Sequence, residues 1–239
     1  MIGHDVAMRF LFVGDSMTIG RSGDFTWRYR MWQHLEATLG AGGYTITGPR
    51  TELYDTEANA PLSHAYGDPA FPAPARRHLA GWGEGWLHMA PVVADAVAAA
   101  RADVLLVSLG LIDLGFYTGS EQTAVNTRAF VTAARAANPN VKMVILPVIP
   151  NIRAESDALF AAECERFNLL LAEAVADLDT PRSPLVLASH PADYDIHTDT
   201  YDGTHPGPTG EHRLAGAFAD AMHQAWAVGG PYAGALAAA

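Results

Sequence analysis

The chain has 239 residues, 49% of them hydrophobic and 17% charged, a composition typical of a water-soluble protein with a full core. Its formal net charge of −11 argues against nucleic acid as a partner, because such binding depends on Lys and Arg neutralising phosphates. No apolar run has the length of a membrane span and the first residues do not resemble a secretory signal, so we expect a cytoplasmic protein without membrane contact. Cys164 is the only cysteine, which excludes an internal disulfide.

Short apolar runs alternate with helical patterns along the chain. In chain order, we expect strands in 8–13, 44–46, "ADVLLVSLG", "VKMVILPVI" and "PLVLAS", and helices over 25–38, 86–100, 121–137, 155–177 and 210–227. Near-continuous apolar strands separated by helices indicate a parallel sheet covered on both faces. Five such strands predict a flavodoxin-like three-layer α/β/α sandwich. We expect one domain over residues 1–228 and a loose tail over 229–239.

Residues 51–85 interrupt this alternation. They are rich in Pro, Gly, Asp and His and show no sustained period, which predicts a long loop. Ligands of open α/β sheets bind at the carboxyl ends of the strands, so a loop leaving the second strand can form one wall of an active site. Five aromatic residues are candidates for that wall, and equally for anchors of the loop: Tyr54, Tyr66, Phe71, Trp82 and Trp86.

The end of the first strand carries the first chemical signal. In "LFVGDSMTIG", residues 11–20, Asp15 and Ser16 directly follow Gly14. A phosphate-binding loop is one interpretation, but neither G-x-x-x-x-G-K-[ST] nor G-x-G-x-x-G occurs here. A nucleophilic serine is another, and a serine needs a neighbouring imidazole to accept its proton.

His205 is the histidine best placed to serve Ser16. It lies in "DGTH", after the last predicted strand, with Asp202 three residues before it. On a turn, this spacing can fold the carboxylate onto one ring nitrogen and leave the other facing the serine. Alone, the pattern is more typical of a helix-capping aspartate beside an exposed histidine, and only its combination with Ser16 favours catalysis.

The acids and histidines between residues 190 and 199 raise the question of a metal site. No motif of three convergent ligands occurs among them. We therefore expect solvated side chains in a polar loop, no metal and no cofactor. The residues concerned are His190, Asp193, Asp195, His197 and Asp199.

From "GDSMT" to "YDGTHPGPTGEHRLA" the chain resembles the GDSL/SGNH hydrolase family, and "SGDFTWRYRMWQHL" and "YDGTHP" are similar to its actinobacterial, carbohydrate-esterase-like branch. The resemblance implies the flavodoxin-like fold. It also implies that Ser16 is the nucleophile, His205 the general base and Asp202 its partner. Asp15 would then brace the turn rather than serve as the acid of the triad.

The same resemblance implies an oxyanion hole with three donors: the Ser16 backbone N–H, a glycine N–H and an asparagine side chain. The glycine falls within "HLAGWGEGW". We expect Gly83, which follows Trp82, in preference to Gly81 or Gly85.

The third donor is missing at its expected place. The family pattern G-x-N-D is replaced by "GLID", residues 110–113, so Ile112 occupies the asparagine position and cannot donate a hydrogen bond. Loss of one such donor typically costs about 10²–10³ in kcat. Asn59 or Asn151 could fill the gap, an activated substrate could tolerate it, or the chain could have left hydrolysis.

These features favour a serine esterase that removes a small, acetyl-like acyl group from a sugar or a secondary metabolite. The only partner expected is that small-molecule ester. Two alternatives stay open. The same triad could transfer an acyl group or close a ring on a bound metabolite, with Ile112 helping to exclude water. Alternatively, the chain could be a binding protein with a decayed site.

Overall fold

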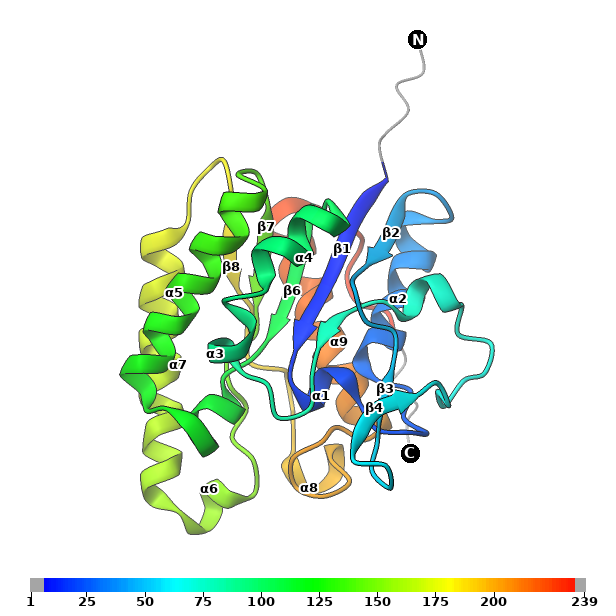
Figure 1. Cartoon of the computed structure of the whole chain (residues 1–239). Coiled ribbons are helices and arrows are strands. Elements are labelled where there is room, and N and C mark those ends of the chain that lie inside the picture. Colours follow the sequence, from blue (N-terminus) through cyan, green and yellow to red (C-terminus); the bar gives the residue numbers. More distant parts are fainter. Residues whose placement is uncertain (1–6, 235–239) are drawn as a thin grey trace.

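The computed structural model describes residues 7–234, which form a parallel sheet with helices on both faces (Figure 1). The strand order is β2-β1-β6-β7-β8, and every pairing in this sheet is parallel. The strands are β1 (Met8–Gly14), β2 (Tyr44–Thr47), β6 (Val104–Ser108), β7 (Lys142–Ile145) and β8 (Leu185–Leu187). This confirms the predicted α/β class and its five parallel strands.

A sixth strand was not predicted. β5 (Leu79–Ala80) has only two residues and pairs in parallel with the end of β1, at Val13 and Gly14. It brings the segment that contains Gly81, Trp82 and Gly83 next to the first strand. The hydrogen bond from the Gly81 N–H to the Gly14 carbonyl extends this contact by one residue.

The helices form the two outer layers (Figure 1). One face is covered by α2 (Trp27–Leu39) and α9 (Pro208–Trp226), which pack on each other, and the other by α4 (Val93–Ala100), α5 (Ser120–Ala137) and α7 (Ala158–Leu178). Two expected helices are interrupted. The helix expected over 86–100 divides into α3 (Trp86–Met89) and α4 on either side of Pro91, whose ring nitrogen has no hydrogen to donate. A separate turn, α6 (Arg153–Ser156), precedes α7.

The expected long loop, 51–85, has more regular structure than its sequence indicates. It holds the antiparallel pair β3 (Leu53–Asp55) and β4 (Ala60–Ser63), a 3₁₀ turn η1 (Ala73–Arg76), and β5. The prediction of a segment without regular structure was therefore wrong. These elements are too short to produce a periodic pattern in the sequence.

Part of the expected tail is held against the body. The Tyr232 N–H donates to Asp220 on α9, and its hydroxyl lies 2.8 Å from His212 Nδ1. Residues 235–239 of that tail lie outside the described residues. Within residues 7–234, no helix has the length and apolarity required to cross a membrane.

All strands of the main sheet point the same way, so their carboxyl ends share one edge. Three segments of interest follow from that edge: Asp15–Ser16 after β1, Gly110–Asp113 after β6, and Asp202–His205 beyond β8 and α8 (Ile196–Asp199). In doubly wound sheets this is the edge at which ligands bind.

Candidate active site

Ser16 is presented at the sheet edge by a tight turn. A Cβ on Gly14 would lie 2.0 Å from Thr18 Oγ1 and 2.8 Å from the Ser108 carbonyl oxygen, so only glycine fits there. Asp15 then caps the short helix α1 (Ser16–Ile19) by accepting the Met17 N–H at 2.9 Å. Ser16 is left at the edge of the sheet and, as a residue, is 4% exposed.

Ser16, His205 and Asp202 form one hydrogen-bonded chain. Ser16 Oγ lies 2.9 Å from His205 Nε2, and His205 Nδ1 lies 2.8 Å from Asp202 Oδ2. These distances allow a Ser–His–Asp relay in which the carboxylate fixes the Nδ1–H tautomer and Nε2 faces the hydroxyl. The structure therefore brings together the three residues predicted for the triad, which are separated by up to 189 positions in the chain.

Asp202 also shapes the turn that carries the histidine. Its Oδ1 accepts the backbone N–H groups of Thr204 and His205, at 3.0 and 2.8 Å. Burial alone would raise the pKa of Asp202, but the hydrogen bonds from the backbone and the ring of His205 outweigh it and lower that pKa. The carboxylate is thus kept ionised, as a partner of an imidazolium requires.

Two aromatic rings stack on the His205 imidazole. Trp82 lies 4.7 Å from it between ring centres at an interplanar angle of 17°, and Tyr201 lies 5.6 Å from it at 14°. The stacking continues outward, because Tyr54 stacks on Trp82 at 4.5 Å and the Arg21 guanidinium lies 3.6 Å from the centre of the Tyr201 ring. We call Tyr54, Trp82, His205 and Tyr201 the ring stack. It fixes the plane of the imidazole and places π-faces against the cation that general-base catalysis would create.

Removing the Tyr201 ring is expected to lower kcat about tenfold, the effect of losing an aromatic or cation–π contact worth about 1.4 kcal/mol. We expect this for Tyr201→Leu, with KM little changed because Tyr201 does not line the cavity beside Ser16. Tyr201→Phe is the matched control. It keeps the ring and removes a buried hydroxyl that has no hydrogen-bond partner among the described residues, so it should retain wild-type kcat. Equal losses in both variants would contradict a role of the ring. Steady-state kinetics on a chromogenic ester measures kcat and KM of the two variants.

The three candidate glycines of the oxyanion hole differ in what their N–H groups do. The Gly81 N–H donates to the Gly14 carbonyl, and the Gly85 N–H donates to His88 Nδ1 at 3.0 Å. Among the described residues, neither the Gly83 N–H nor the Ser16 N–H has a hydrogen-bond partner, and both residues line the same cavity. This arrangement leaves Ser16 and Gly83 as the two backbone donors free for an oxyanion.

The structure distinguishes the two asparagines that could replace the missing donor. Asn59 lies in the β3–β4 turn, where its side chain accepts the Tyr54 hydroxyl. Asn151 lines the cavity beside Ser16, and its Oδ1 accepts the Arg153 N–H at 3.2 Å. The Asn151 Nδ2 donates to no group within residues 7–234. Ile112 lines the same cavity.

Two buried carboxyl groups lie beneath the site. Asp113 accepts the Trp86 and Leu87 N–H groups, at 2.8 and 3.0 Å, at the start of α3. Burial raises the pKa of Asp15 to about 7, and the nearby charge of Asp113 contributes in the same direction. Burial also raises the pKa of Asp113. Asp15 is therefore a bracing group of the turn whose charge the fold does not favour.

Asp15 makes stability depend on pH in a defined direction. A carboxyl whose pKa rises from 3.8 to about 7 on folding stabilises the native state below pH 4, and this contribution is lost as the pH rises through 7. The shift corresponds to about 4 kcal/mol. In Asp15→Asn we expect this loss of stability between pH 5 and pH 8 to disappear, because an amide does not titrate. The fold should survive, because the amide oxygen can still cap α1.

Urea unfolding at pH 5 and pH 8 tests this expectation. The exposed Asp193 provides the control, since Asp193→Asn should keep the pH dependence of the wild type. If the stability of Asp15→Asn depended on pH as in the wild type, Asp15 would not be the source of that dependence.

The predicted aromatic wall divides into two groups. Tyr54 and Trp82 belong to the ring stack, and Trp82 also lines the cavity. Tyr66, Phe71 and Trp86 are at most 5% exposed and pack in the core, so they are anchors rather than wall residues. Tyr201 was missed, although its position next to Asp202 in "YDGTH" was the available signal.

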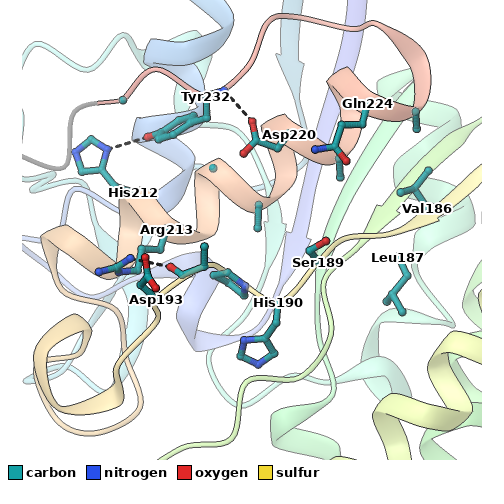
Figure 2. A pocket seen from close by; sticks show the side chains of 17 residues that line it. Val186, Leu187, Ser189, His190, Asp193, His212, Arg213, Asp220, Gln224 and Tyr232 are labelled. Atoms are coloured by element: carbon teal, nitrogen blue, oxygen red, sulfur yellow. Dashed lines mark hydrogen bonds between the residues drawn. The ribbon is translucent and has the colours of Figure 1, made fainter.

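A second cavity, of about 490 Å³, lies between α9 and the segment that follows β8 (Figure 2). It is larger than the cavity beside Ser16 and shares no lining residue with it. Figure 2 shows Tyr232 between His212 and Asp220, with its hydroxyl hydrogen-bonded to the His212 ring and its backbone N–H donating to the Asp220 carboxylate. Arg213 is paired with Asp199 and the Ala192 carbonyl. The polar groups of Tyr232, His212, Asp220 and Arg213 are thus engaged within the protein. No group of three or more metal-ligating side chains occurs in the described part of the chain, the loop over 190–199 included.

A parallel α/β sheet that carries a hydrogen-bonded serine, histidine and aspartate at its carboxyl edge has the architecture of a serine hydrolase. Residues 12–213 match the model of the GDSL-like Lipase/Acylhydrolase family, and the chain belongs to this family. Membership of this family makes the protein an esterase or acylhydrolase.

Solved structures show the same fold. A carbohydrate esterase family 3 protein from Talaromyces cellulolyticus is 24% identical, with a TM-score of 0.74 over 91% of this chain and 97% of that one. An acetyl esterase mutant with acetate ion gives the same values. A family 3 carbohydrate esterase from Clostridium thermocellum is 16% identical, with a TM-score of 0.70 over 91% and 96%. A search of curated proteins gave no match.

Proposed function

We propose that this protein hydrolyses a carboxylic ester of a small molecule through Ser16, His205 and Asp202. The observation that carries the proposal is the continuous hydrogen-bonded chain from Ser16 Oγ through the imidazole to Asp202, with distances of 2.9 and 2.8 Å. The names of the structural neighbours, which concern carbohydrate and acetyl esters, support an ester as the substrate.

The first step forms an acyl-enzyme. Ser16 Oγ attacks the ester carbonyl carbon while its proton passes to His205 Nε2, and Asp202 stabilises the resulting imidazolium. The bond from the carbonyl carbon to the alcohol oxygen then breaks, and the same proton leaves with the alcohol. In the second step, water gives its proton to His205 and its oxygen to the acyl carbon, which releases the acid and restores Ser16.

The tetrahedral intermediates need donors for their oxyanion. We assign this role to the Ser16 and Gly83 N–H groups and, in place of the missing asparagine at 112, to the Asn151 amide. Donors fixed in advance in a site sheltered from water stabilise the charge that develops on the carbonyl oxygen. Ile112 then lies where the family's asparagine would be, as part of the cavity wall.

Hydrolysis and acyl transfer differ in the fate of the acyl group. With a chromogenic ester in ¹⁸O-labelled water, hydrolysis by this route puts one ¹⁸O into each acid released and none into the alcohol. We expect this result from the wild type. Acyl groups retained in an ester, amide or ring would support the transferase or cyclase alternative, and absence of any turnover would support a decayed site.

A further inference from the structure

The cavity next to Ser16 has a volume of about 380 Å³, within the range of small-molecule sites. An acetyl group would occupy a small part of it. Its lining beyond the triad includes a set of apolar side chains drawn from three places along the chain: Leu111, Ile112, Phe116, Tyr117 and Phe160. We call these five residues the apolar wall.

The apolar wall includes two aromatic side chains that face solvent. Phe116 is 77% exposed and Tyr117 is 52% exposed. Both lie on a single π-helical turn, η2 (Asp113–Tyr117), closed by the Thr118 N–H to the Asp113 carbonyl at 2.8 Å. Wide turns of this kind often occur at functional sites, and exposed apolar side chains at a cavity mouth indicate a binding surface.

The rest of the lining is poorly suited to a strongly hydrated ligand. None of its residues carries a carboxylate, in a chain with a net charge of −11. Among the described lining residues Arg153 is the only one with a fixed positive charge, and it is engaged by Asp157 and the Gly115 carbonyl while its guanidinium lies 4.5 Å from the centre of the Phe160 ring. Apart from Ser16, His205, Asn151 and Arg153, the described lining offers the hydroxyls of a sugar only Thr204 and the polar edges of Trp82 and Tyr117.

The chemistry at Ser16 determines which part of the ester lies in the cavity. The departing alcohol must lie at His205 Nε2 to receive its proton, and the carbonyl oxygen must lie at the Ser16 and Gly83 N–H groups. The fourth substituent of the reacting carbon is the acyl chain, for which the remaining space is bounded by the apolar wall.

We propose that the cavity binds an apolar acyl group longer than acetyl, so that the preferred substrates are esters of medium-chain or aromatic acids. This inference rests on the proposed ester hydrolysis and adds the class of substrate. Ile112 then has a role of its own, because an isoleucine contacts an alkyl chain where an asparagine would require a polar partner.

Two ester series test the proposal on the whole protein. In p-nitrophenyl esters from acetyl to octanoyl, kcat/KM should rise about fourfold per methylene until the wall is filled, which corresponds to about 0.8 kcal/mol for each buried CH₂. In acetate esters of increasingly long alcohols, kcat/KM should change little. The hexanoyl-to-acetyl ratio of kcat/KM should fall about tenfold in Phe116→Ala and in Ile112→Asn. Leu159→Ala, an exposed apolar residue that does not line the cavity, should keep the ratio of the wild type.

The outcomes separate this proposal from the proposed function. If the acetyl ester is hydrolysed fastest, the proposed acyl site is overturned while ester hydrolysis stands. The same follows if the hexanoyl-to-acetyl ratio is unchanged in both Phe116→Ala and Ile112→Asn. A kcat/KM that rises with the length of the alcohol instead of the acyl group would also overturn the acyl site. No hydrolysis of any ester by folded wild-type protein would overturn both proposals.

Discussion

Replacing Ser16 by alanine is expected to lower kcat/KM for ester hydrolysis by about 10⁴-fold or more, because the acyl-enzyme route is lost and only oxyanion stabilisation and binding remain. The fold should be unaffected. Asp15, not Ser16, caps α1, and within residues 7–234 the one hydrogen bond of the Ser16 hydroxyl is to His205. Initial rates on a p-nitrophenyl ester, with circular dichroism and thermal unfolding of the same samples, measure both effects.

Ser189→Ala is the matched control for this substitution. Ser189 is exposed and lines the remote cavity, so its replacement should leave hydrolysis unchanged. Activity of Ser16→Ala equal to that of the wild type would remove Ser16 from the mechanism.

Replacing Asp202 by asparagine is expected to lower kcat about 10⁴-fold at pH 7. The amide oxygen of the new side chain can keep the bonds from the Thr204 and His205 N–H groups, so the turn should survive. The amide nitrogen would then face His205 Nδ1 and donate to it. That forces the proton onto Nε2, where it blocks transfer from Ser16.

Asp193→Asn is the control for a loss of negative charge that does not involve the triad, since Asp193 is exposed and lines the remote cavity. We expect wild-type kinetics from it. If Asp202→Asn retained wild-type kcat with its fold intact, the carboxylate would have no part in setting the tautomer of His205.

The main sheet could be predicted because β1, β6, β7 and β8 are built around near-continuous apolar runs, and such runs separated by helices are typical of a parallel sheet. β5 could not be predicted. Leu79 and Ala80 form a strand only because the end of β1 lies beside them, at Val13 and Gly14. Nothing in two residues signals that pairing, although it positions Gly83.

The site shows a similar division. Ser16 and the Asp202–His205 pair were recognisable because each stands in a short motif, Ser16 directly after β1 and the pair between α8 and α9. The ring stack was not, since Trp82 is brought to the imidazole from a distant segment and Tyr201, although it directly precedes Asp202, stacks on the ring only through the fold of the turn. Likewise, the choice among Gly81, Gly83 and Gly85 depends on which N–H groups other atoms occupy, and only the folded chain provides that information.

The central claim is that Ser16 is the nucleophile activated by His205. A fluorophosphonate reacts covalently with an activated serine, and peptide mass spectrometry locates the adduct. We expect one adduct per chain, on Ser16, in the wild type, and none in Ser16→Ala or His205→Gln. An adduct on another residue, or unlabelled Ser16 in a folded protein that still hydrolyses esters, would contradict the account.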